Sequence, residues 1–387
     1  MSYKIRILIV HNSYQSHGGE DSVVDSEIKL LQSHGHEVVT YFRSNNEILN
    51  ADKFSVARQT LWSVKTVDDI SKLIISVRPD VVHVHNTFPL ISPSLYWAID
   101  SLKIPVVQTL HNFRLSCLSA LYLRDSAVCE DCVGTLPWRG VLRKCYRNST
   151  AASVVLTGML ALHRKIGTFQ NKVTKYIALN DFCRNKFIEG GLPGNKITVK
   201  PNFIDEPTLS NCSRSGFLFV GRLSLEKGIS VLAKALTSFR LPLIRIAGDG
   251  PLRSELDGVS GVTLLGLLDS GRVHAEMNAA MALIVPSIWY ENFPRTIVEA
   301  YACGLPVIAS RIGALEELVI DGVTGLLFEP NNPSDLAEKM RWASEHPEEM
   351  ARMGLEARQV YLRDLTAEKN YSKLIDIYNS AIGDMGA

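Results

Sequence analysis

The chain has 387 residues, of which 46% are hydrophobic, 21% charged and 8% aromatic, so it is long enough for two globular domains. Its formal net charge of +1 gives no indication of a nucleic-acid-binding protein. The first apolar run is too short for a signal peptide and no small-residue cleavage site follows it, so we interpret it as a strand. Seven cysteines without a secretory signal favour a cytoplasmic protein, in which clustered cysteines indicate a metal before disulfides.

The first half alternates predicted strands and helices, as in a parallel α/β sheet. A loop with Gly18 and Gly19 follows the first strand, and a helix is expected over about 21–34. Glycines at a helix N-terminus can hold an anion with backbone N–H groups, although a plain tight turn has the same sequence. A further helix is expected over 62–77. The predicted strands are 4–10, 36–42, 80–85, 104–110, 176–179 and 197–200.

His111 directly follows the predicted strand 104–110. A lone histidine is usually structural. Ligands of open α/β sheets, however, bind beyond the carboxyl ends of the strands. His111 is therefore a candidate site residue.

Residues 113–150 interrupt the α/β alternation and contain four cysteines, Cys117, Cys129, Cys132 and Cys145. Four thiolates in a loop-rich segment suit tetrahedral zinc, which would stabilise an insert that has little core of its own. Four unligated thiols in an ordinary loop are the alternative. An iron–sulfur cluster is disfavoured because the spacing matches none of the common ferredoxin patterns.

The span from Val133 to Asn180 contains no Asp or Glu. It includes an apolar helix expected over 151–162, which is too short to cross a bilayer. Basic, aromatic and apolar residues together favour an anionic membrane surface, and a solvated basic face is the alternative. No nucleic-acid motif accompanies them, so we expect no nucleic-acid partner. The positive residues are Arg139, Arg143, Lys144, Arg147, Arg164, Lys165, Lys172 and Lys175, and Trp138 and Tyr146 lie among them.

A polar stretch after residue 200 is the predicted interdomain linker, and the α/β pattern then restarts. Within the second half, residues 282–310 read as strand, loop, short helix, turn and strand. Pro294 is expected in the first turn of that helix, where its missing N–H costs nothing. The predicted strands are 217–220, 243–247, 262–265, 282–285, 307–309 and one within 324–330. The predicted helices are 229–238, 272–280, 313–321 and most of 334–382.

Four charged side chains follow predicted strand ends of the second half: Arg222, Lys227, Glu291 and Glu299. A guanidinium and an ammonium are natural ligands of a diphosphate. A carboxylate can accept two hydrogen bonds from a ribose diol, which suits Glu299. Any one residue alone would more often form a surface ion pair, but all four at one sheet edge favour a nucleotide site.

The sequence resembles the family-4 retaining glycosyltransferases over nearly its whole length. The resemblance rests on five segments: HGGED, TLHN ending at Asn112, VGRLSLEKG, AGDGPLR and PSIWYENFPRTIVEAYACGLPVIAS. The last contains the Glu-x₇-Glu pattern as Glu291 and Glu299. The resemblance implies an α/β protein of the GT-B class, with two Rossmann-like domains that face each other across a cleft. Two features depart from the family: ENFPR replaces a glycine-richer segment, and many members lack the cysteine insert.

The resemblance also implies roles at matching positions. Arg222 and Lys227 would bind the donor diphosphate, with backbone N–H groups around Asn292 and Phe293. Glu299 would bind the ribose. Donor-sugar contacts would come from Glu291 and from His111, and the loop with Gly18 and Gly19 would approach the phosphates and the acceptor. No catalytic metal is expected, because the cations would stabilise the leaving group.

The expected domains are residues 1–202, with the insert at 113–150, then 203–364, and a helix over 365–387 that packs back on the first domain. The expected function is transfer of a sugar from a UDP- or GDP-sugar to a lipid-linked or glycan acceptor in bacterial polysaccharide or lipopolysaccharide synthesis. The expected location is the cytoplasm or the inner face of the plasma membrane. A nucleotide-sugar 2-epimerase of the same fold is the alternative enzyme, and a non-catalytic sugar-nucleotide-binding protein is a third interpretation.

Overall fold

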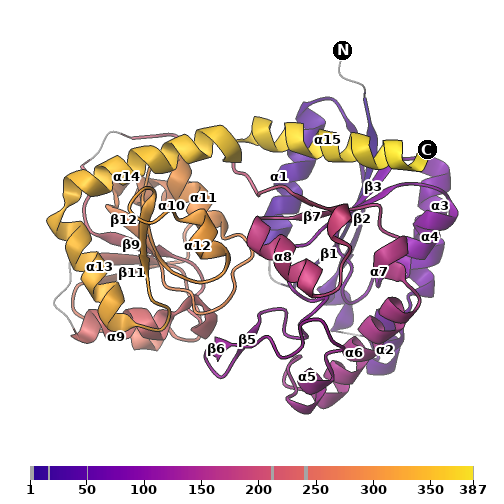
Figure 1. Cartoon of the computed structure of the whole chain (residues 1–387), viewed down its shortest axis with the longest axis horizontal. Coiled ribbons are helices and arrows are strands. Elements are labelled where there is room, and N and C mark those ends of the chain that lie inside the picture. The colour runs from indigo at the N-terminus through magenta and orange to yellow at the C-terminus, as the bar shows by residue number, and fades with distance from the viewer. Residues whose placement is uncertain (1–3, 16–17, 50, 211–212, 239–242, 387) are drawn as a thin grey trace. The chain divides into compact units, whose positions relative to one another are not determined.

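A computed structural model describes the chain except residues 1–3, 16–17, 50, 211–212, 239–242 and 387 (Figure 1). The described residues form two compact units. The first contains most of the N-terminal half together with the chain from Asn370 onwards. The second contains Asn202–Lys369 and the short segment Tyr122–Cys129, which belongs to the cysteine insert.

The first unit is built on a six-stranded parallel sheet with strand order β2-β1-β3-β4-β7-β8. Its central strands are largely buried on both faces, as expected where helices cover a parallel sheet on each side. The side chains of β3 are all buried. The strands are β1 (Arg6–Ser13), β2 (Glu37–Ser44), β3 (Val81–Asn86), β4 (Val106–Thr109), β7 (Lys175–Ala178) and β8 (Ile197–Val199).

Among the described residues of the first unit, four α-helices begin at side-chain caps, which are Asp52, Ser63, Ser149 and Asn180. The helix predicted over 62–77 is observed from Val64 to Val77, two residues shorter at its start. A separate helix, Lys53–Leu61, precedes it. The break lies at Ser63, whose side chain accepts the N–H of Thr66 and caps the second helix. The helices are α1 (Gly19–Ser33), α2 (Lys53–Leu61), α3 (Val64–Val77), α4 (Leu95–Ser101), α5 (Trp138–Leu142), α6 (Thr150–Lys165), α7 (Thr168–Asn171), α8 (Asp181–Glu189) and α15 (Ala367–Gly386).

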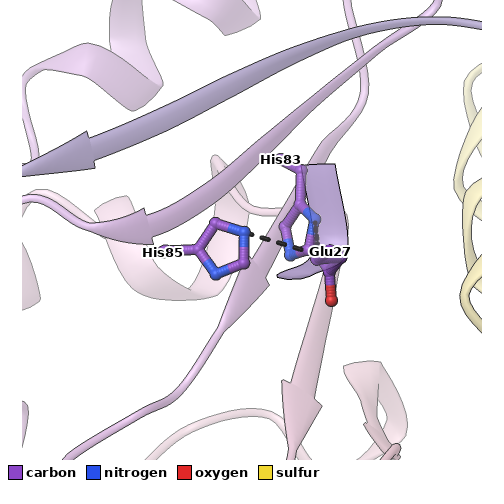
Figure 2. A group of neighbouring side chains, drawn as sticks. All are labelled: Glu27, His83 and His85. Carbon is purple, nitrogen blue, oxygen red and sulfur yellow. Dashed lines mark ion pairs between the residues drawn. The ribbon is translucent and has the colours of Figure 1, made fainter. Parts of the chain in front are cut away.

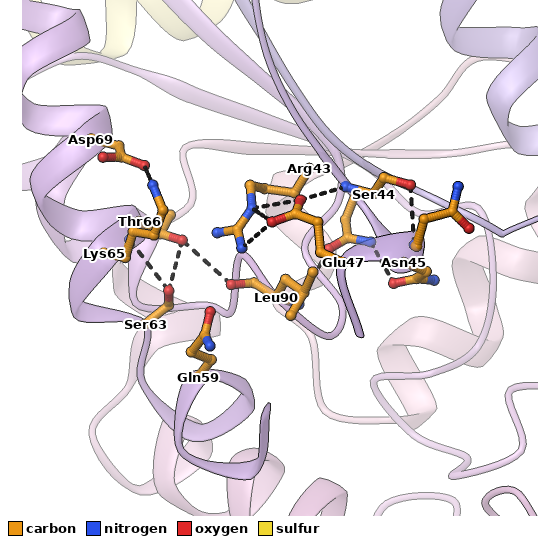
Figure 3. Close-up of polar contacts among 12 residues, drawn as sticks. Arg43, Ser44, Asn45, Glu47, Gln59, Ser63, Lys65, Thr66, Asp69 and Leu90 are labelled. Carbon is orange, nitrogen blue, oxygen red and sulfur yellow. Dashed lines mark hydrogen bonds and ion pairs between the residues drawn. The ribbon is translucent and has the colours of Figure 1, made fainter. Parts of the chain in front are cut away.

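Polar contacts also fix the loops that follow β2 and precede α3 (Figure 3). Arg43 binds the Glu47 carboxylate through Nε and Nη2. The same carboxylate accepts the Ser44 N–H at 3.0 Å, which closes a capping box. Thr66 donates its hydroxyl to Ser63 at 2.8 Å. These contacts hold the chain in place beside the carboxyl edge of the sheet.

The C-terminal helix α15 contributes to the core of the first unit. Leu374, Ile377, Tyr378 and Ala381 are buried in one cluster with side chains of β1, α1 and β3. Burial of each large aliphatic side chain in such a cluster stabilises the fold by about 1.5–3 kcal/mol. The last helix is therefore an integral part of the first unit.

The second unit has a six-stranded parallel sheet with strand order β11-β10-β9-β12-β13-β14. The strands are β9 (Phe217–Val220), β10 (Ile244–Ala247), β11 (Val262–Gly266), β12 (Ala282–Val285), β13 (Val307–Ser310) and β14 (Gly325–Phe328). The helices are α9 (Ile229–Ser238), α10 (Ser270–Ala279), α11 (Arg295–Ala302), α12 (Ala314–Leu318), α13 (Pro333–Glu345) and α14 (Pro347–Val360). A short hairpin, β5 (Leu123–Arg124) and β6 (Ala127–Val128), is grouped with this unit.

Two helical predictions for the second half need correction. Pro294 is the N-cap of α11 rather than a residue of its first turn, because its backbone is extended. The helix predicted over 313–321 is only five residues long and ends at Leu318. The tail predicted to be mostly helical over 334–382 is confirmed, as α13, α14, a π-helical turn at Tyr361–Leu365 and α15, with Pro347 beginning α14.

Candidate functional site

The loop after β9 carries the predicted cations of the second unit. Arg222 is exposed and Lys227 is partly buried. Gly228 ends this loop with φ +73°, and a Cβ there would lie 1.7 Å from the Pro286 carbonyl oxygen. Gly248, after β10, has φ +145°, and its Cβ would lie 1.9 Å from the Gly221 oxygen. Glycine is therefore required where the three loops after β9, β10 and β12 meet.

Lys227 and Glu291 are in direct contact. The Lys227 Nζ lies 2.6 Å from Oε1 of Glu291, and the Ser287 hydroxyl donates to the same oxygen at 2.7 Å. The Glu291 side chain is 6% exposed, so the ammonium compensates a carboxylate that is nearly out of water. The structure thus joins two of the predicted residues through the ends of β9 and β12.

Two polar groups in the segment on either side of Glu291 have no hydrogen-bond partner within the described part of the chain. They are the indole N–H of Trp289 and Nε of Arg295, both buried. The Lys227 ammonium also lies 5.6 Å from the centroid of the Trp289 ring. Buried polar atoms are normally hydrogen-bonded, so these atoms indicate a polar ligand. The sequence analysis missed both residues, although both lie inside the stretch that carries the Glu-x₇-Glu pattern.

Glu299 lies within α11, eight positions after Glu291. Burial raises the pKa of its carboxyl, while Arg295 and His274 act in the opposite direction. The side-chain carboxyl of Glu299 has no hydrogen bond to another described residue, so its oxygens can accept from a ligand. Asn292 and Phe293 are buried in the segment that leads into α11.

His111 lies two residues beyond β4, at the carboxyl edge of the first sheet. Its Nε2 is 2.9 Å from Nδ1 of His85, at the end of β3, and the two rings are stacked. His111 lines a small pocket with residues that include Gln108, Asn112 and Arg114. The guanidinium of Arg114 lies 4.9 Å from the centroid of the Phe88 ring in the same wall. The strand edge that the sequence indicated thus contains a pocket.

The N-terminus of α1 lies at the same edge of the first sheet. Gly18 is its N-cap and donates its N–H to Asp21, whereas Gly19 is exposed and a Cβ there would meet nothing within 4 Å. No contact among the described residues therefore requires glycine at position 19. Part of the predicted loop, residues 16–17, lies outside the described residues.

Glu20 is a further candidate site residue, which was not predicted from the sequence. Its Oε2 accepts the Tyr14 hydroxyl at 2.9 Å, and the Asn112 amide lies 3.4 Å away. Burial raises the pKa of Glu20 to about 7, although the hydrogen bond from Tyr14 acts to lower it. The motif HGGED contains this carboxyl, but only the fold shows that it lies beside Asn112, next to His111.

The four cysteines of the insert are all partly exposed. Among the described residues, the group of His, Cys, Asp and Glu atoms close enough to share a metal ion is a different one, Glu27 with His83 and His85. The zinc prediction for Cys117, Cys129, Cys132 and Cys145 therefore remains a prediction.

Most of the basic residues between Val133 and Asn180 bind to other residues of the chain. Arg164 donates to the carbonyl oxygens of Thr135 and Leu115, and Arg139 to that of Asp131. Ion pairs also occupy Arg143, Lys172 and Lys175. Lys144, Arg147 and Lys165 are exposed. Within the described residues, no helix is both long and apolar enough to cross a membrane.

Both halves of the chain match the sequence models of known protein families. Residues 17–206 match Glycosyltransferase Family 4, and residues 203–360 match Glycosyl transferases group 1. Both halves match glycosyltransferase families. The second match includes Arg222, Lys227, Glu291 and Glu299, and the first includes His111.

Individual relatives agree with this result. The chain is 36% identical over 179 residues to an uncharacterized glycosyltransferase of Methanocaldococcus jannaschii, which is 43% of this chain and 50% of the relative. It is 35% identical over 159 residues to the D-rhamnosyltransferase WbpZ of Pseudomonas aeruginosa, 39% of this chain and 42% of the relative. The matches thus span about half the length of these curated relatives.

The whole chain is also similar to solved structures. The HepE protein of Anabaena, determined in complex with UDP, has a TM-score of 0.69 at 17% identity, with 97% of this chain and 100% of that chain covered. The similarity confirms the predicted fold class, two Rossmann-like units of the GT-B type.

Proposed function

We propose that the protein is a retaining glycosyltransferase that moves a sugar from a nucleotide-diphosphate donor to an acceptor of cell-surface glycan synthesis. The observation that carries the proposal is the buried contact of Glu291 with Lys227 at the carboxyl ends of β9 and β12. It combines a cation for a diphosphate and a carboxylate for sugar hydroxyls in one place. The matches to glycosyltransferase families support the same reaction class.

The donor would be held mainly by the second unit. Arg222 and Lys227 would bind the diphosphate, with the N–H groups around Asn292 and Phe293. Glu299 would accept hydrogen bonds from the ribose diol, which suits a carboxyl that has no hydrogen bond to a described residue. Trp289 and Arg295 have buried N–H groups that would donate to the same ligand.

The first unit would supply further residues for the donor sugar and for the acceptor. His111 would contact the donor sugar. Gly18 and Gly19, at the N-terminus of α1, would let the acceptor and phosphates approach the backbone. Glu20 would accept a hydrogen bond from an acceptor hydroxyl, because its Oε1 is buried without a partner among the described residues.

The reaction would break the bond between the anomeric carbon and the phosphate oxygen, and the electron pair would leave with the diphosphate. The acceptor oxygen would form the new bond on the same face, and its proton would pass to the leaving phosphate. Negative charge therefore develops where Arg222 and Lys227 would lie. Removing one such stabilising donor typically costs 10²–10³-fold in turnover.

A UDP-sugar is the first donor to test, because the structurally similar HepE binds UDP, and a GDP-sugar is the second. The acceptor would be lipid-linked or a glycan precursor. The helices α2, α5 and α6 pack together in the first unit (Figure 1) and expose Phe54, Leu142 and Val154. Exposed apolar side chains beside Lys144 and Arg147 suit an anionic membrane surface, where a lipid-linked acceptor would reside. Structural zinc at the four cysteines would stabilise the insert, which contains α5 and leads into α6.

The deciding experiment incubates the protein with radiolabelled UDP-, GDP- and ADP-sugars and a lipid extract. Transfer of label to an acceptor, with retention of the anomeric configuration, is expected for one nucleotide. Label recovered only as an altered nucleotide sugar without acceptor would instead identify a 2-epimerase. Full transfer by Glu291→Ala or Lys227→Ala would overturn the site assignment.

A further inference from the structure

A chain of buried side chains connects the interior of the first unit to His111. Glu27 of α1 lies at its inner end, 1% exposed. Its Oε1 is 3.5 Å from Nε2 of His85, and Nδ1 of His85 is 2.9 Å from Nε2 of His111. A carboxylate, an imidazole and a second imidazole thus follow one another to the sheet edge. Figure 2 shows the inner part, with His83 and His85 both directed at Glu27.

The same cluster could be taken for a metal site, because Glu27, His83 and His85 have ligand atoms within 4.8 Å of one another. A cation is already present there. The ammonium of Lys200, 1% exposed, lies 3.0 Å from Oε2 of Glu27 and 3.1 Å from Oδ1 of Asn370. A divalent ion would place three positive charges around one carboxylate, so the site is better explained as a buried ion pair.

Other contacts occupy His83 fully. Its Nε2 lies 2.8 Å from the Thr109 hydroxyl, and its Nδ1 lies 2.7 Å from the Tyr378 hydroxyl of α15 and 3.0 Å from Glu27. His83 is therefore fixed between β4 and the C-terminal helix. His85 is therefore the ring that contacts both Glu27 and His111.

Charge and burial determine where the protons lie. Burial would raise the pKa of Glu27, but Lys200 and His83 outweigh it, and its pKa is well below the ordinary value, so the group is a carboxylate. Burial lowers the pKa of His85 to about 3 and also lowers that of His111, with the neighbouring histidines adding to the effect, so both rings are neutral. A neutral ring has one donor and one acceptor nitrogen.

The carboxylate then selects one arrangement. Nε2 of His85 faces an anion and must carry the proton, because a lone pair there would be repelled. Nδ1 of His85 is consequently an acceptor, and the proton of the 2.9 Å contact belongs to Nε2 of His111. Nδ1 of His111 is then an acceptor, and it has no hydrogen-bond partner within the described residues.

We propose that Glu27 and His85 are positioning residues that hold His111 as a neutral imidazole protonated at Nε2, so that its Nδ1 accepts a hydrogen bond from ligand. If the proposed function holds, that ligand group is a hydroxyl of the donor sugar. His111 then distinguishes a hydroxyl, which can donate, from a deoxy or methoxy carbon, which cannot. In other proteins, a carboxylate that accepts a hydrogen bond from one nitrogen of an imidazole fixes the tautomer of that ring in the same way.

The test is histidine ¹⁵N NMR of the full-length protein between pH 5 and 9. His111 is expected to keep one neutral form, protonated at Nε2, throughout. Protonation at Nδ1, or titration within this range, would overturn the proposal. The charged and titratable groups that face this ring are His83, His85, His11 and Glu27, and Asp21 pairs with His11.

Substitutions separate positioning from folding. In His85→Leu, His111 should lose its tautomer preference and start to titrate, whereas His85→Gln should restore it, because a side-chain amide oxygen can accept from Nε2–H. An unchanged His111 spectrum in His85→Leu would refute the role of His85. His346→Leu, an exposed histidine of the second unit, is the matched control.

Activity gives an independent readout once a donor is known. His85→Leu should lower kcat/KM about tenfold and make kcat fall below pH 7, with the Kd for UDP alone unchanged. A fall in UDP affinity without a new pH dependence would show that His85 acts only on structure. If the wild-type protein transfers no sugar, the proposed function fails, but the NMR result still decides the tautomer.

Discussion

The Lys227 ammonium lies 2.6 Å from the Glu291 carboxylate, which is 6% exposed. The two residues come from different loops, 64 positions apart. The cation that we propose to bind the diphosphate is thus already paired with a carboxylate in the free protein. Donor binding must therefore compete with Glu291 for Lys227, or draw both into one network.

The first prediction follows from this competition. Glu291→Gln should free the ammonium and tighten binding of UDP alone about tenfold, which corresponds to about 1.4 kcal/mol, while it lowers turnover. Lys227→Met should weaken UDP binding and lower turnover together. Isothermal titration measures the first effect. Lys234→Met, an exposed lysine of α9, is the control and should change neither quantity. Equal UDP affinity in Glu291→Gln and wild type would contradict the competition.

The second prediction concerns glycines with opposite environments. Gly248→Ala combines a clash at 1.9 Å with φ +145°, so it should destabilise the second unit by at least about 1–3 kcal/mol. Gly383 lies exposed in α15 with nothing within 4 Å, so Gly383→Ala should stabilise by about 0.5–1 kcal/mol. Urea unfolding measures both changes. A stable Gly248→Ala protein would show that the loops after β9 and β10 are not in close contact.

Local patterns were sufficient to predict most of the fold. Short, mainly apolar runs bounded by turn residues placed all twelve strands of the two parallel sheets, because strands that helices cover are largely apolar. The hairpin of β5 and β6 was missed, since its two strands have only two residues each and are mostly exposed. The short helices α4 and α5 were missed because tertiary packing, not periodicity, stabilises such segments.

Among the candidate site residues, the sequence predicted that Lys227 and Glu291 lie at one sheet edge, because both follow strands of the same parallel sheet. Contacts between distant segments were not predictable. Nothing in the run DVVHVH indicates that His83 and His85 both face Glu27, or that Lys200, 173 positions away from Glu27, neutralises it. Local spacing also could not show that most cations of the basic span have internal partners.

The third prediction uses the carboxyl of Glu20, whose pKa is raised by burial from 4.5 to about 7. A raised folded-state pKa stabilises the fold below pH 4.5, and this contribution is lost as the pH rises through 7. Glu20→Gln cannot ionise, so its unfolding free energy relative to wild type should increase from pH 5 to pH 8. Denaturant unfolding at both pH values measures it. Asp25→Asn, exposed on the same helix, is the control, and parallel profiles for Glu20→Gln and wild type would refute the raised pKa.

The fourth prediction concerns the exposed apolar side chains of α2 and α5. Phe54 is 87% and Leu142 73% exposed, so both should insert into a membrane surface. Vesicles with anionic lipids should float the wild-type protein, less so at high salt. Phe54→Ser with Leu142→Ser should abolish flotation, whereas Leu355→Ser, equally exposed in α14, should not. Equal flotation with neutral vesicles, or unchanged flotation of the double variant, would contradict the prediction and favour the alternative that the basic residues form a solvated face.

The fifth prediction concerns the cysteine insert. If Cys117, Cys129, Cys132 and Cys145 hold a tetrahedral ion, the purified protein should contain about one zinc per chain under reducing conditions. Cys132→Ser should lose it, and Cys303→Ala, a buried cysteine of the second unit, should retain it. The free energy of metal binding would also stabilise the folded insert. A chelator should therefore make the insert sensitive to protease before the rest of the chain unfolds. A metal-free wild-type protein with a protease-resistant insert would show that ordinary packing, not zinc, stabilises this segment.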